Sequence, residues 1–127
     1  MKKLLILLLP VILLSASCRK APMLNLFNQG SPQKVTMAQM ETAILEAGKS
    51  LNWRMAKMQP GLIEGTLLVR SHTAVVNISY SEDKYSIVYK SSINLKADGT
   101  GKIHKNYNAW IRALDQEIRN RLMEFRN

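Results

Sequence analysis

The strongest constraint on the fold is a change of hydrophobic period in the middle of the chain. Three runs in which apolar and polar side chains alternate lie between residues 62 and 91: Leu62–Arg70, Thr73–Tyr80 and Lys84–Ser91. A period of two is typical of strands that bury one face. The gaps between the runs, Ser71-His72 and residues 81–83, are short enough for hairpin turns. The runs therefore predict an antiparallel meander with one covered face.

Helical patterns flank this meander on both sides. Upstream, Thr36 suits a helix N-cap and Gln39 completes a capping box. The short run Trp53–Met58 and a turn at Pro60-Gly61 then lead into the meander. Downstream, an apolar stripe predicts a long helix over Lys105–Phe125. The predicted fold class is α+β: an N-terminal helix, an antiparallel meander of three to four strands and a long C-terminal helix, with the helices packed on one sheet face.

The first eighteen residues carry a targeting pattern. Lys2 and Lys3 precede the apolar run Leu4–Leu14, which is too short to cross ~30 Å of hydrocarbon. Three small residues then precede Cys18, the only cysteine of the chain. This arrangement resembles the lipobox of bacterial lipoproteins, and the resemblance implies a signal peptide over residues 1–17 and a lipidated Cys18. The alternative is an ordinary secretory signal, with Cys18 left as an unpaired thiol.

The resemblance also indicates a compartment. In residues 18–35, the resemblance implies a lipidated Cys18, and Pro22, Gly30 and Pro32 among polar residues predict a flexible tether. A small α+β domain is expected to follow over residues 36–127. Loss of Lys2 and Lys3 with the signal lowers the formal charge from +9 to +7. For an exported protein this charge points to anionic lipid, lipopolysaccharide, peptidoglycan or an envelope protein as partner, and not to nucleic acid. Arg19, in place of an Asp after the cysteine, favours the outer membrane, facing the periplasm.

A second resemblance covers most of the domain after the first helix. It rests on the stretches YSIVY from Tyr85, SINL from Ser92 and IHKNYNAWI from Ile103. These stretches are similar to a family of small bacterial lipoproteins with no established activity. The resemblance implies an envelope location and this fold, and it assigns no catalytic residue.

The residues carry no signature of an enzyme. His72 and His104 are far apart and lack the spacing of metal ligands, and no Gly-x-Ser-x-Gly nucleophile motif is present. Glu64 is the only carboxylate inside a predicted strand, where a cross-strand ion pair accounts for it. We therefore expect no cofactor, no metal and a non-enzymatic binding or scaffolding module. The alternative is a small periplasmic enzyme or ligand sensor with a polar pocket around His72 and His104.

The start of the last helix is a candidate binding site. His104, Tyr107 and Asn108 could form a polar pocket for a glycan or peptide. The interpretation that we favour is a hydrogen-bond network that locks the helix to the sheet, because Tyr107 lies on the apolar stripe and a buried tyrosine hydroxyl normally has a partner.

A basic stripe along the last helix is the second candidate. Four cations recur every seven residues and so share one face: Lys105, Arg112, Arg119 and Arg126. Asp115 is placed to pair with Arg119, and Glu117 is placed to pair with Arg121. Lys105, Arg112 and Arg126 are then left for phosphate or carboxylate groups of the envelope, or for solvent.

Overall fold

The computed structural model describes residues 19–125, which form two helices and seven strands. The helices are α1 (Met37–Ser50) and α2 (Lys105–Met123). The strands are β1 (Lys20–Pro22), β2 (Leu26–Gly30), β3 (Trp53–Gln59), β4 (Leu62–Val69), β5 (His72–Tyr80), β6 (Lys84–Ile93) and β7 (Lys102–His104). Within these residues, neither helix is long and apolar enough to cross a membrane.

The strands form two antiparallel sheets. The larger sheet has the order β2-β6-β5-β4-β3, and β1 pairs with β7 in a separate two-stranded sheet. The α+β class and the helix on each side of the meander are confirmed. The expected count of three to four strands is wrong, because β2 adds a fifth strand beside β6 and because β1 and β7 form a pair of their own.

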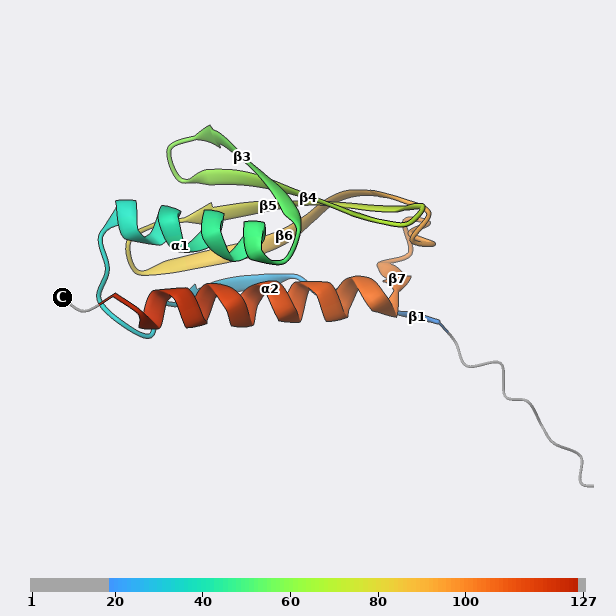
Figure 1. Cartoon of the computed structure of the whole chain (residues 1–127). Helices are drawn as coiled ribbons and strands as arrows, with labels where there is room; N and C mark the ends of the chain where they lie inside the picture. Colours follow the sequence, from blue (N-terminus) through green and yellow to red (C-terminus); the bar gives the residue numbers. More distant parts are fainter. Residues whose placement is uncertain (1–18, 126–127) are drawn as a thin grey trace, which may run out of the picture.

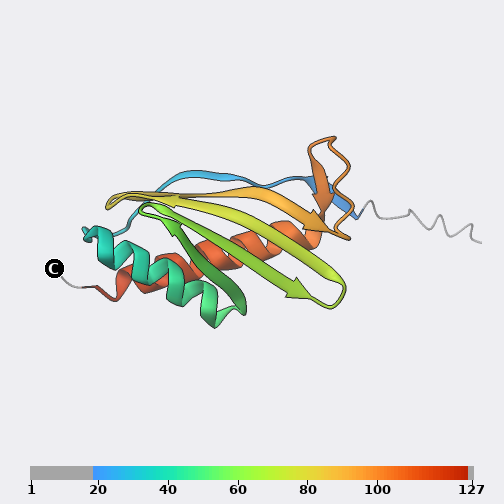
Figure 2. The ribbon, with the colours of Figure 1, turned by 90° about the horizontal axis from the view of Figure 1, so that it is seen from above.

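The expected flexible tether is also wrong for residues 20–30. This segment lies along the edge of the main sheet and continues into the small sheet (Figure 2). Its backbone is bonded to distant parts of the chain: Met23 N donates to Gly101 O over 2.9 Å, and Leu24 N donates to the side chain of Asn108 over 2.9 Å. Backbone pairing of this kind orders a segment without requiring an alternating sequence.

The central strands bury the faces that their alternation predicts. On β5 these side chains are Ala74, Val76, Ile78 and Tyr80, and on β6 they include Tyr85 and Ile87. The β4–β5 turn lies one residue earlier than expected, at Arg70-Ser71, so that His72 pairs with Val69 as the first residue of β5.

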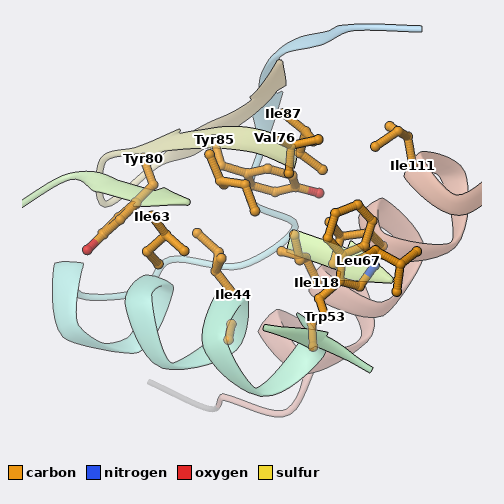
Figure 3. Packing of buried hydrophobic residues seen from close by; sticks show 14 of the residues in the cluster. Ile44, Trp53, Ile63, Leu67, Val76, Tyr80, Tyr85, Ile87, Ile111 and Ile118 are labelled. Atoms are coloured by element: carbon orange, nitrogen blue, oxygen red, sulfur yellow. The ribbon is translucent and has the colours of Figure 1, made fainter. Parts of the chain in front are cut away.

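Both helices lie on the same side of the five-stranded sheet (Figure 1). The capping box of Thr36 and Gln39 is formed at the start of α1. Ile44 of α1 and Ile118 of α2 point toward Ile63 and Tyr85 of the sheet (Figure 3). The packing differs from two helices that are each seated on the sheet: α1 approaches α2 and the edge strand β3, and α2 approaches α1 and the small sheet.

Two buried tyrosines tie the sheet to the helices. The Tyr80 hydroxyl donates to Glu41 of α1 over 2.7 Å, and the Tyr85 hydroxyl donates to Asp115 of α2 over 2.5 Å. Burial raises the pKa of Tyr85, and the hydrogen bond to Asp115 raises it further. The Tyr85 hydroxyl therefore stays protonated and fixes α2 to β6.

Candidate functional site

Five cationic side chains gather at one end of the molecule, which we call the basic end. Different elements contribute them: Arg19 precedes β1, Arg70 lies in the β4–β5 turn, Lys96 follows β6, Lys102 begins β7 and Lys105 begins α2. All five residues are exposed. In Figure 1 this end is on the right, where β1, β7 and the start of α2 meet the β4–β5 turn.

The first described residue is fixed to this end. Arg19 O accepts a hydrogen bond of 2.8 Å from Lys105 N at the start of α2. The next residue, Lys20, pairs with His104 in the small sheet, and its side chain forms an ion pair of 2.8 Å with Asp98. The basic end is therefore the part of the domain that lies nearest to Cys18 along the chain, although Cys18 itself is outside the described residues.

A short polar network joins the β4–β5 turn to the loop after β6. The Asn94 side-chain amide donates to the Ser71 hydroxyl over 2.8 Å, and His72 Nδ1 lies 2.6 Å from Asn94 O. These bonds join the chain beside Arg70 to the loop that contains Lys96. Both residues have positive φ, +56° at Arg70 and +60° at Lys96, a conformation uncommon for side chains of this size.

His104 lies among these cations and caps α2. Its Nδ1 accepts a hydrogen bond of 3.1 Å from Asn106 N, which requires an unprotonated Nδ1. Burial lowers the pKa of His104, and the charges of Lys96, His72, Arg19 and Lys105 lower it further. Local positive charge and the capping hydrogen bond thus both favour neutral imidazole.

The structure brings His72 and His104 together without Glu64. The two imidazole centroids are 6.3 Å apart. Glu64 instead forms an ion pair of 2.5 Å with Lys90 across β5. No group of three or more potential metal ligands occurs within residues 19–125. A hollow of about 380 Å³ lies at the opposite end of the sheet, between residues 31–35 and Glu82-Asp83.

Asn108 and Tyr107, predicted as neighbours in one cluster, differ in their surroundings. The buried Asn108 side chain accepts from Leu24 N over 2.9 Å and donates to Pro22 O over 2.8 Å, so it holds the N-terminal segment on α2. The Tyr107 hydroxyl is buried and has no hydrogen-bond partner in the described part of the chain. Its ring packs edge to face on Tyr89, with centroids 5.7 Å apart.

The predicted basic stripe is described in part. Lys105 and Arg112 are exposed on α2, whereas Arg126 lies outside the described residues. The expected pairs are present, with Arg119 at 3.4 Å from Asp115 and Arg121 at 2.9 Å from Glu117. Lys105 and Arg112 are therefore the described members of the stripe that project into solvent without such a pair.

Sequence reasoning missed three residues of the basic end: Arg70, Lys96 and Lys102. A signal for some of them was present, because every second turn of an antiparallel meander lies at the same end of the sheet. Arg70 follows β4 and Lys96 follows β6, so the strand order alone predicts both cations at the same end of the sheet.

Comparison of the chain with protein-family models, curated proteins and solved structures found no match in any of the three.

Proposed function

We propose that the chain is a lipoprotein of the bacterial envelope, anchored through Cys18, that acts as a non-enzymatic binding or scaffolding module. Its partner in this proposal is an anionic envelope component or a protein, and its place is the periplasmic side of the outer membrane. Support comes from the order of the sequence, in which a basic start, a short apolar run and three small residues lead directly to Cys18.

The observation that carries the proposal is the attachment of Arg19 to the basic end. Arg19 directly follows Cys18, and its carbonyl is bonded to the first residue of α2. A membrane anchor at Cys18 would hold the exposed cations of this end near lipid phosphates or the acidic groups of the envelope. A lipid chain contributes ~0.8 kcal/mol per buried CH₂, so several chains would keep this arrangement in place.

The alternative of an enzyme or ligand sensor rests on the proximity of His72 and His104. The two rings lie among cations, and Glu64 is held elsewhere by Lys90. A metal site needs further ligands beside the two imidazoles, and within residues 19–125 no third one lies with them. His72 Nδ1 contacts Asn94 O and His104 Nδ1 accepts from Asn106 N, so the backbone engages one nitrogen of each ring, and we favour the binding module.

The anchor is tested by replacing Cys18 with Ser in the full chain. Cells are labelled with a fatty-acid analogue and fractionated into membrane and soluble parts. We expect the label and the membrane recovery to be lost together. A matched control combines Cys18→Ser with Ser31→Cys, which keeps one thiol but moves it away from the apolar run, and this variant should also remain unlabelled. Unchanged labelling of the Cys18→Ser chain would overturn the lipoprotein assignment.

A further inference from the structure

Two large apolar side chains are exposed beside the basic end. Leu68 is 57% exposed and Ile93 is 66% exposed. They lie in one row across the sheet, because Thr73 of β5 pairs with Leu68 on one side and with Ile93 on the other. Both are on the sheet face opposite the helices, since the alternate residue Leu67 points into the core. Removing the exposed parts of these two side chains from water would be favourable.

The five cations of the basic end have no ion-pair partner among the described residues. Asp98 lies in the same loop as Lys96, but hydrogen bonds from Lys20 and Thr100 already engage it and hold its pKa well below the usual range. An apolar row bordered by exposed Arg and Lys is the pattern of a surface that rests in the headgroup region of a bilayer.

The chain connection points to the same partner. Cys18 directly precedes Arg19, and one residue of chain spans at most ~3.6 Å. Since Arg19 is bonded to Lys105, a lipid on Cys18 would leave the basic end almost no freedom to move away from the membrane. The apolar row and the cations thus lie at the one end of the domain that an anchor would bring to the bilayer.

We propose that the basic end, together with Leu68 and Ile93, is a membrane-contacting surface that binds the phosphate groups of anionic lipids and sets the orientation of the domain. This proposal rests on the proposed attachment through Cys18. A second copy of the chain is a poor occupant of the surface, because a symmetric contact would oppose two sets of unpaired cations. An acidic protein could also bind these cations, and the experiment below distinguishes such a protein from lipid.

The test uses the full lipidated chain reconstituted in vesicles of phosphatidylcholine mixed with phosphatidylglycerol. A fluorescent probe is attached to one introduced thiol, from Leu68→Cys, Ile93→Cys or Met58→Cys, while Cys18 carries the lipid. Met58 is 55% exposed but lies near the β3–β4 turn at the far end of the sheet. Quenching by headgroup-labelled lipid should be at least about twofold stronger for probes at positions 68 and 93 than at position 58, because only the first two side chains reach the headgroup boundary.

Two charge variants then test the role of the cations. Arg70→Gln, Lys96→Gln and Lys102→Gln together should reduce quenching of the probe at position 93. Lys49→Gln, Lys57→Gln and Lys84→Gln together remove the same charge from exposed positions away from the basic end and should leave the quenching unchanged. In pure phosphatidylcholine, or at high salt, the quenching should also fall, because screening weakens contacts between exposed charges.

The outcomes separate this inference from the anchor. Equal quenching at positions 68, 93 and 58 in a chain that stays with the vesicles would overturn the membrane-contacting surface and leave the anchor intact. A protein that does not stay with the vesicles would contradict both. An unquenched probe at position 93 that becomes shielded only when an acidic envelope protein is added would assign the surface to that protein instead.

Discussion

At the scale of single residues, the side chain of Asn108 holds the segment around Pro22 and Leu24 on α2. Its amide satisfies both Leu24 N and Pro22 O, two backbone groups at the end of β1 and in the link to β2. We expect Asn108→Ala to lower the free energy of unfolding by about 2 kcal/mol, because two hydrogen bonds are lost and partly buried groups are left unpaired. Asn106, two residues earlier in α2, is exposed. Asn106→Ala should change the free energy of unfolding by less than about 0.5 kcal/mol. Equal unfolding free energies for the two variants, measured in urea, would contradict this role.

His104 gives the molecule a pH-dependent helix cap. Because the pKa of His104 is lowered in the folded chain from its ordinary value of 6.5, the unfolded chain takes up this proton first as the pH falls. The free energy of unfolding should therefore be highest above pH 6.5 and should decrease as the pH drops below that value. Protonation would also remove the acceptor for Asn106 N.

The variant His104→Asn isolates this effect, since Asn caps a helix but does not titrate in this range. Urea unfolding followed from neutral to mildly acid pH should show a shallower pH dependence for His104→Asn than for the parent. His72→Asn removes the neighbouring imidazole and should retain the step that belongs to His104. A parent and a His104→Asn chain with the same slope would show that the cap is not the titrating group.

At the scale of elements, the parts that sequence predicted are those stabilised by burial. Strand β5 places a buried residue at every second position from Ala74 to Tyr80, so its period is visible in the sequence. Strands β1 and β2 were missed because they are short, lack alternation and are held by backbone hydrogen bonds and by the side chain of Asn108. The last-helix stripe led to Lys105, and the order of the meander places Arg70 and Lys96 at one end of the sheet. The addition of Lys102 depends on the pairing of β1 with β7, which no alternation in the sequence indicates.

The contact between α1 and β3 depends on the absence of a side chain at Gly48. A Cβ at this position would lie 2.5 Å from three atoms of the Met55 side chain. Alanine normally stabilises a helix interior by about 1 kcal/mol relative to glycine. Here we expect Gly48→Ala to be destabilising by about 1 to 3 kcal/mol, because Met55 must be displaced from a packed position.

A double-mutant cycle tests this packing. When Met55→Ala has removed the obstructing side chain, adding Gly48→Ala should stabilise the protein, so the effect of Gly48→Ala changes sign between the two backgrounds. Lys49→Ala, at the next and exposed position of α1, should behave alike in both backgrounds. A destabilising Gly48→Ala of equal size in both backgrounds would mean that Met55 is not what the glycine accommodates.

At the scale of the whole molecule, the fold separates two ends. Alternate turns of the meander and the N-terminal strands place the basic end beside Arg19, while the hollow bordered by Glu82 and Asp83 lies at the other end. Both helices lie on the same side of the sheet (Figure 1), and the opposite face carries the Glu64–Lys90 ion pair and the exposed Leu68 and Ile93. A lipid on Cys18 would therefore fix which of these surfaces faces the membrane and which faces the periplasm.

The orientation of the domain at the membrane should depend on the direct connection between Cys18 and Arg19. A flexible Gly-Ser segment of about 15 residues, inserted between Cys18 and Arg19, has an r.m.s. reach of ~20 Å and would lower the effective concentration of the basic end at the bilayer. We expect a probe at position 93 in the reconstituted full chain to be quenched less in this variant, with the larger loss at higher salt. The same segment inserted after Glu82, at the far end, should have no effect on quenching. If the insertion before Arg19 also leaves quenching unchanged at every salt concentration, the short connection is not what holds the basic end on the membrane, and its own contacts suffice.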